Sequence, residues 1–238
     1  MSDSLDVMNA RRQKESGNAL IYVLIAIALF AALSFTLSRG TDTGETGSLD
    51  EERAGLLATQ LISYTAQAKQ ALDQMVFMGA DVNNIDFTLP TDAAFNTAPH
   101  GNKIFHPEGG GLIPGKLPAN AISGTLTDPV PGWYIGRFNN VEWTATNAPE
   151  VILVAYQIPE LVCESINKKV TGNTTIPIMN DSIKETLIDD ALYSVGANVD
   201  LSTADPGDIC TACHERVSLC VQNDTQNAYG FYTILADQ

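Results

Sequence analysis

Cysteine and histidine are the residues whose types and spacing could do chemistry in this chain. The run Cys210-Thr211-Ala212-Cys213-His214 matches C-x-x-C-H, the attachment signature of c-type haem. Two thiols at this spacing can bond to both vinyl groups of the porphyrin, and the next histidine can ligate the iron. One interpretation is therefore an electron-transferring monohaem protein, in which Cys210, Cys213 and His214 hold the haem.

Disulfide bonds are the interpretation that we favour. The chain has four cysteines, and an even number in a domain that faces an oxidising compartment is typical of a disulfide framework. Cys163, Cys210, Cys213 and Cys220 allow three pairings, which the sequence does not distinguish. We expect Cys163 to pair with one member of the 210–220 cluster and the other two to pair locally. Closing a loop of about fifty residues would stabilise the fold by roughly 3–4 kcal/mol in the chain-entropy description.

A zinc site is a third alternative. Cys210, Cys213, His214 and Cys220 together offer the donors of a Cys₃His set at short spacing. Free thiolates are scarce in an oxidising compartment, so we expect no resident metal or cofactor.

The remaining polar residues do not form a known catalytic motif. The sequence has no G-x-S-x-G, H-E-x-x-H, kinase or Rossmann fingerprint, so we expect no enzyme. His100 and His106 flank loop prolines and glycines, and we expect them to be solvated or bonded locally. The triplet Gly109-Gly110-Gly111 lacks the Gly-Lys-Ser/Thr ending of a phosphate loop and predicts a surface turn.

Acidic residues dominate the charge of the chain. There are 28 Asp and Glu against 13 Lys and Arg, for a formal net charge of −15. Such a surface repels nucleic-acid phosphates, so we expect no nucleic-acid partner. Two groups of oxygen-bearing side chains could line a calcium loop: Asp81, Asn83 and Asp86, and Asp200, Asp205 and Asp208. Neither group has the twelve-residue calcium pattern with its closing glutamate, so we expect these side chains to be solvated.

The first forty residues predict a membrane segment. Residues 19–37 carry no charge, and at about 1.5 Å per residue they span roughly 28 Å, close to the thickness of a bilayer's hydrocarbon core. Arg11, Arg12 and Lys14 precede the segment and only Arg39 follows it closely, which predicts a cytoplasmic N-terminus. The apolar run is longer than that of a cleaved secretory signal, which favours a retained anchor.

The N-terminal pattern resembles the signal of type IV pilins and type II secretion pseudopilins. A hydrophilic leader ends in Gly17, and the apolar segment follows from Asn18. The resemblance implies that a prepilin peptidase cuts after Gly17 and methylates the amino group of Asn18. Tyr22 stands where the family usually has glutamate, which implies a minor pilin or a tip pseudopilin. A plain single-pass anchor without processing remains the alternative.

Four parts of the chain follow from these patterns. They are a cytoplasmic leader (1–17), a transmembrane helix (18–38), a flexible linker rich in glycine (39–50) and an exported headgroup (51–238). The expected fold class is α+β, with an amphipathic helix packed on a small antiparallel sheet, as in pilin headgroups.

Hydrophobic periodicity predicts the elements of the headgroup. Residues 51–78 have apolar residues at steps of three and four, which indicates a helix; we expect Met75, Phe77 and Met78 to be packed in the core. A loop-dominated region follows over 80–132. Strands are predicted at 132–136, 141–144, 151–156 and 229–235, with a helix at 160–169.

The expected function is structural. The protein would sit in the cytoplasmic membrane as a single-pass anchor, with its C-terminal domain periplasmic or extracellular. Its expected partners are membrane lipid, other pilin-like subunits and a prepilin peptidase. The alternative is a membrane-anchored c-type cytochrome.

Overall fold

A computed structural model describes residues 16–40, 45–141, 143–146, 148–188, 209–224 and 226–236. The chain divides between Asp50 and Glu51 into two compact units. Each unit is described by itself.

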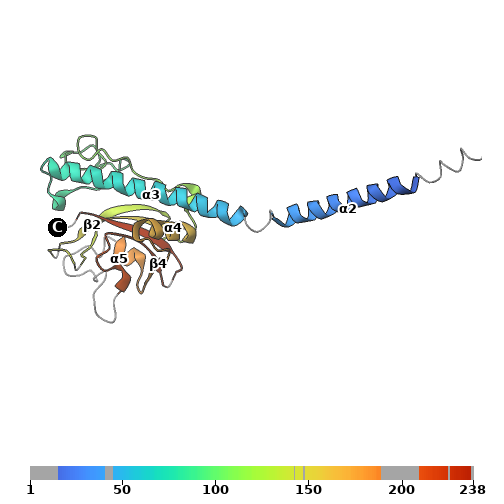
Figure 1. Ribbon diagram of the computed structural model, residues 1–238. Helices are drawn as coiled ribbons and strands as arrows, with labels where there is room; N and C mark the ends of the chain where they lie inside the picture. The colour runs from blue at the N-terminus through green and yellow to red at the C-terminus, as the bar shows by residue number, and fades with distance from the viewer. Residues whose placement is uncertain are drawn as a thin grey trace, which may run out of the picture. The chain divides into compact units, whose positions relative to one another are not determined.

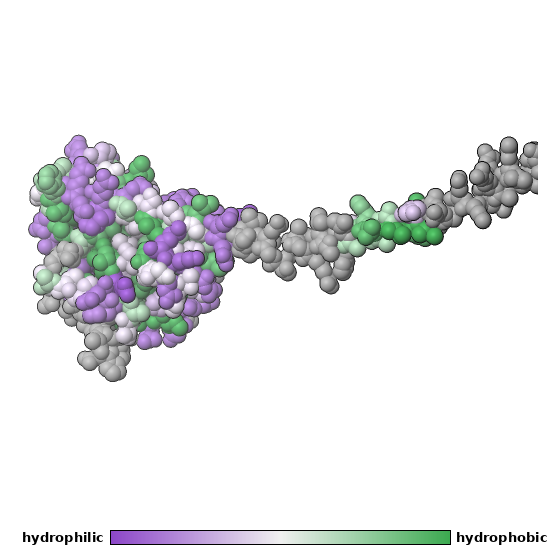
Figure 2. Space-filling view, viewed as in Figure 1, coloured by the Kyte–Doolittle hydropathy of each residue, from purple (hydrophilic) through white to green (hydrophobic). Residues whose placement is uncertain are grey.

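The first unit contains helix α2 (Ser16–Gly40), and helix α3 (Glu45–Phe77) begins in it. The side chains of α2 are described for residues 21–32 and 34, and all of them are exposed. Figure 2 shows that this stretch is strongly hydrophobic. Among residues whose side chains are described, no helix is both long and apolar enough to cross a membrane. The linker expected at 39–50 is helical at residues 39–40 and 45–50, and residues 41–44 lie outside the described part of the chain.

Helix α3 packs one stripe of its surface against the sheet. Its buried residues recur at helical spacing, as the sequence predicts, and include Ala58, Leu61, Ala68, Leu72 and Met75. The helix runs along the sheet in Figure 1, and these residues pack with strand residues in two core clusters. The expected amphipathic helix on a sheet is therefore confirmed.

The C-terminal end of α3 corrects one expectation. The amide of Ala80 donates to the carbonyl of Met75 and that of Gly79 to Val76, with Gly79 at φ +97°, so a left-handed glycine ends the helix. Phe77 and Met78 were expected in the core but are 92% and 58% exposed. Phe77 lies two residues, about 200°, around the helix from buried Met75 and so faces away from the sheet.

In the described part of the chain, five strands form one sheet in the order β1-β2-β5-β4-β3. Neighbours are antiparallel except β3 and β4, which are parallel, so the sheet is mixed rather than antiparallel as expected. The two-residue β3 follows helix α4 in the sequence and pairs in parallel with β4, at the edge of the sheet opposite β1. The strands are β1 (Gly132–Asn139), β2 (Glu150–Ile158), β3 (Ile178–Met179), β4 (Ser218–Asn223) and β5 (Tyr229–Ala236).

Both faces of the sheet are covered, and the interior strand β2, between β1 and β5, shows it most clearly. All nine of its residues are buried. Val151, Leu153 and Ala155 pack on the face that carries α3, whereas Ile152 and Val154 pack on the opposite face. Burial on two faces explains why this strand is a continuous apolar run in the sequence rather than an alternating one.

Helices α4 (Glu160–Thr171) and α5 (Ile183–Leu187) cover opposite faces of the sheet. The helix predicted at 160–169 is thus confirmed, and Gly172 ends it at φ +80°. The prediction of a strand at 141–144 is wrong. Val141 and Thr144 lie in a turn and donate hydrogen bonds to the buried carboxylate of Glu150, at 2.7 and 2.6 Å.

The region 80–131 is irregular, as expected, apart from the short 3₁₀ helices η1 (Val82–Asn84) and η2 (Ala119–Ala121). Two cationic side chains, Lys103 and Arg137, donate hydrogen bonds to backbone carbonyls of this region. The ammonium of buried Lys103 donates to the carbonyls of Ala94, Phe95 and Thr97. The guanidinium of Arg137, on β1, donates to the carbonyls of Val82 and Ile85 at 3.1 and 2.7 Å.

Candidate functional site

The predicted processing site lies at the start of α2. Gly17 and Asn18 fall in the first turn of the helix, which begins at Ser16. Proteases bind substrates in extended form, and a glycine in a helix lowers the stability of that turn by roughly 0.5–1 kcal/mol relative to alanine. The basic residues Arg11, Arg12 and Lys14 lie outside the described residues. Cleavage after Gly17 stays a prediction.

A disulfide between Cys163 and Cys220 joins α4 to β4. The two cysteines are separated by 57 residues in the sequence and by 5.4 Å between their Cα atoms, and both are fully buried. This bond confirms the expectation that Cys163 pairs with a member of the 210–220 cluster. It lies between α4 and the sheet, in the core cluster that also contains Leu61 of α3.

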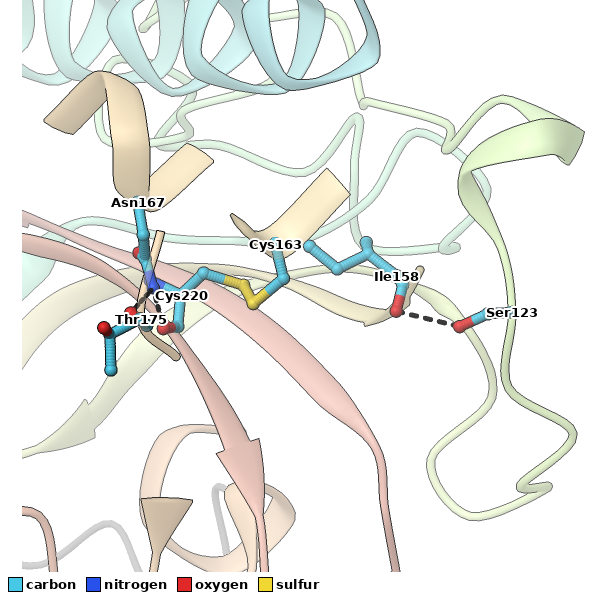
Figure 3. Close-up of a disulfide and its surroundings, with 6 residues drawn as sticks. All are labelled: Ser123, Ile158, Cys163, Asn167, Thr175 and Cys220. Atoms are coloured by element: carbon cyan, nitrogen blue, oxygen red, sulfur yellow. Dashed lines mark hydrogen bonds between the residues drawn. A yellow bond between two sulfur atoms is a disulfide. The ribbon is translucent and has the colours of Figure 1, made fainter. Parts of the chain in front are cut away.

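Asn167 makes a second link between α4 and β4, beside the disulfide (Figure 3). Its side-chain oxygen accepts from the amide of Cys220 at 2.8 Å, and its nitrogen donates to the carbonyl of Cys220 at 2.8 Å. The same nitrogen donates to the carbonyl of Thr175 at 3.0 Å. The buried amide therefore satisfies the outer backbone groups of β4 at Cys220, as a neighbouring strand would. The only sequence signal for this contact is the position of Asn167 one turn after Cys163.

The end of the irregular region, just before strand β1, is also fixed from the sheet. Figure 3 shows the hydroxyl of Ser123 donating to the carbonyl of Ile158, a bond of 2.8 Å. The side chain of buried Gln157 accepts from the amide of Leu126 and donates to the carbonyls of Leu126 and Pro129. These bonds hold the end of the irregular region against β2.

The second disulfide joins Cys210 to Cys213 across the 3₁₀ helix η4 (Thr211–Cys213). This is the local pair that we expected, and all four cysteines are bonded. Both sulfur atoms of the C-x-x-C-H motif are thus committed to each other, and thioether bonds to haem would require this disulfide to be reduced first. His214 is partly exposed and meets the ring of Trp143 edge-on, with centroids 5.7 Å apart.

The alternative zinc set does not come together. Cys220 is bonded to Cys163, and Cys210 and Cys213 pack in the core on the other face of the sheet from that disulfide. The set of Cys210, Cys213, His214 and Cys220 was plausible only because these residues are close in sequence.

The acidic groups considered for calcium serve local turns where they are described. Asp81 accepts from the amide of Asn83 at 2.9 Å and from the side chain of Asn84 at 3.3 Å, which caps η1. Asp86 accepts from the amide of Thr88 at 2.8 Å. Asp200, Asp205 and Asp208 lie outside the described residues.

Sequence reasoning missed one cluster. The sequence predicts solvated or locally bonded loop histidines at 100 and 106, and the structure stacks their rings with centroids 4.3 Å apart and places Glu108 beside them. Their spacing in the sequence fits no standard ligand motif, so only the fold of the loop reveals the cluster.

Comparison with known proteins gives no family to which the chain can be assigned: no protein family, curated protein or solved structure matches it.

Proposed function

We propose that the protein is a non-enzymatic structural or assembly protein that resembles a minor pilin or a type II secretion pseudopilin. In this proposal residues 18–38 anchor the chain in the cytoplasmic membrane with the N-terminus in the cytoplasm. Residues 51–238 form a periplasmic or extracellular headgroup. Its partners are membrane lipid, a prepilin peptidase and other pilin-like subunits.

The observation that carries the proposal is the exposed apolar surface of α2. Every large apolar side chain from Ile21 to Phe30 exposes at least half of its surface, from 50% at Ile25 to 77% at Phe30. An apolar surface of this size is stable only when lipid or another protein covers it. The absence of charge over residues 19–37 favours lipid as the cover.

The headgroup supports the proposal through its layers and its crosslinks. A long helix covers one face of a largely antiparallel sheet, which is the arrangement that the pilin resemblance implies. The Cys163–Cys220 disulfide ties helix α4 to β4, which pairs with the last strand, β5. Two disulfides are typical of domains that mature in an oxidising compartment, outside the cytoplasm.

Processing of the N-terminus tests the kinship with pilins. We expect the mature chain, purified from a host with a prepilin peptidase, to begin at a methylated Asn18. Replacing Gly17 with Val adds a branched side chain at the cleavage site and should leave the leader attached. The Ser16→Ala variant, altered one residue away, should be processed normally. An intact Met1 in the wild-type protein would contradict the pilin kinship and leave a plain anchored domain.

A further inference from the structure

His100, His106 and Glu108 converge in the irregular region between α3 and β1. One potential ligand atom of each residue lies within 4.8 Å of those of the other two. The Nδ1 atom of His100 lies 3.2 Å from Oε2 of Glu108, and the two imidazole rings are stacked at 24° between planes. From these positions we propose that the three residues bind one divalent transition-metal ion, of which Zn²⁺ is the best match.

The distances suit a shared cation. Two ligand atoms that each lie about 2.1 Å from a zinc ion and 3.2 Å from each other subtend an angle of about 100° at the metal, between tetrahedral and octahedral values. The carboxylate of Glu108 is 72% exposed, so it can rotate towards the ion. The two ring planes are 24° apart, so the imidazoles rotate about their broad χ2 torsions to direct both lone pairs at one ion.

The ring nitrogens of the two histidines make few hydrogen bonds in the described part of the chain. Nε2 of His100 is buried and has no hydrogen-bond partner among the described residues. Nδ1 of His106 accepts only a long hydrogen bond from the amide of Glu108, at 3.2 Å, and a metal ion can replace this contact. Coordination through Nδ1 of His100, the atom beside Glu108, places the ring proton on Nε2, so Nε2 is not itself a ligand.

The backbone around the cluster is built for close approach. A Cβ atom on Gly109 would lie 2.2 Å from the carbonyl oxygen of Lys103, and one on Gly110 would lie 2.5 Å from that of Ile104. The amide of Gly110 donates to the carbonyl of Lys103 at 3.1 Å. The glycine triplet, predicted as a surface turn, thus folds the chain back so that Glu108 reaches His100.

The donor set selects the class of metal. Two imidazoles and one carboxylate match a three-ligand zinc site, with a fourth position left for water. Calcium and magnesium prefer oxygen ligands throughout and would not be held by two histidines. His106 is buried and packs against Phe95, so part of the site is shielded while Glu108 leaves it accessible from solvent. Bound metal would tie residues 100–108 together and stabilise the irregular region.

Competition with a chromophoric zinc chelator tests the proposal on the full chain in detergent. We expect the wild-type protein to take up one Zn²⁺ ion and to melt at a higher temperature when Zn²⁺ is present, because metal binds the folded state. Glu108→Gln should weaken Zn²⁺ binding about tenfold or more, since it removes the anionic ligand. His100→Ala should lose binding and the thermal shift.

Controls separate metal binding from folding. The His214→Ala variant removes a partly exposed histidine elsewhere in the headgroup and should bind Zn²⁺ as the wild type does. The side chain of Glu108 is largely exposed, so Glu108→Gln keeps the fold even if His106 variants do not. Calcium at the same concentration should produce no thermal shift. Failure of the wild-type protein to bind Zn²⁺ would overturn the proposal, and so would Zn²⁺ binding by Glu108→Gln and His100→Ala that is as tight as that of the wild type.

Discussion

At the scale of single residues, Asn167 completes the hydrogen bonding of a strand from outside the sheet. Its amide pairs with both backbone groups of Cys220 and also with Thr175. Asn167 and Cys220 are fully buried, so water cannot replace these bonds. One helix side chain thus joins α4, the segment before β3, and β4.

Truncation of Asn167 measures this link. We expect Asn167→Ala to lower the free energy of unfolding by about 3 kcal/mol, because three backbone groups lose their partner in the core. Chemical denaturation of the full chain in detergent measures the change. Lys169→Ala, an exposed position on the same helix, should change stability by no more than about 0.5 kcal/mol. Equal stability of the two variants would show that Asn167 is not a structural link.

Tyr64 gives a prediction about pH. Its hydroxyl donates to the carbonyl of Ile113 at 3.1 Å and accepts from the amide of Gly115 at 2.6 Å. Burial raises the pKa of Tyr64 above 10.0, and the Gly115 amide offsets this in part. The unfolded chain therefore loses this proton first, so the contribution of neutral Tyr64 to stability is complete below pH 10.0 and declines as pH rises towards the folded pKa.

Comparison with Tyr64→Phe isolates that contribution. Burial also raises the pKa of Tyr134, Tyr156 and Tyr229, so the wild-type slope contains several groups. Unfolding free energies measured from pH 8 to 11 should fall more steeply above pH 10 in the wild type than in Tyr64→Phe. Parallel curves would mean that Tyr64 titrates alike in the folded and unfolded chain.

At the scale of elements, α3 shows that one stripe of a long helix determines its packing. Leu61 is 1% exposed and lies against the sheet and α4, whereas Leu56 is 73% exposed on another side of the same helix. We expect Leu61→Ala to destabilise the headgroup by about 3 kcal/mol through lost burial and a cavity. Leu56→Ala should cost less than about 0.5 kcal/mol. Thermal unfolding of the two variants compares them, and a larger loss for Leu56→Ala would contradict the packing of α3.

The two disulfides should differ in their effect on stability. The Cys163–Cys220 bond closes a separation of 57 residues and the Cys210–Cys213 bond a separation of 3. Replacing the first pair with alanine should cost about 4 kcal/mol, and replacing the second about 2 kcal/mol, in the chain-entropy description. Denaturation curves under non-reducing conditions measure both. The reverse order would mean that the local bond, and not the link from α4 to β4, stabilises the headgroup.

Elements with strong periodicity could be predicted from the sequence. The stripe of α3, the apolar run of β2, helix α4 and the terminal strand β5 all carry patterns that burial imposes directly. Strands β3 and β4 were missed. β3 has only two residues, and the outer edge of β4 at Cys220 is completed by Asn167, a contact 53 residues distant in the sequence.

The candidate sites also include some that the sequence predicts and some that depend on tertiary contacts. The cysteine pairing could be predicted because Cys163 is far from the other three cysteines in the sequence. A bond from Cys163 to one of them leaves two neighbouring cysteines, which can pair locally. The strand predicted at 141–144 failed because the carboxylate of Glu150 binds Val141 and Thr144 in a turn. The cluster of His100, His106 and Glu108 depends on the close backbone contacts of Gly109 and Gly110, which no local pattern encodes.

At the scale of the whole molecule, the chain contains an exposed apolar helix and a crosslinked α+β headgroup. The headgroup buries its own core on both faces of the sheet. Helix α2 leaves its described apolar side chains exposed and needs a cover. The proposed compartment and the proposed kinship with pilins both depend on this division of roles.

Alkaline extraction of membranes from cells that express the full chain tests this claim most directly. We predict that the wild-type protein stays in the membrane pellet and that deletion of residues 19–37 releases a folded headgroup into the soluble fraction. Recovery of the intact wild-type chain in the soluble cytosolic fraction would contradict the account.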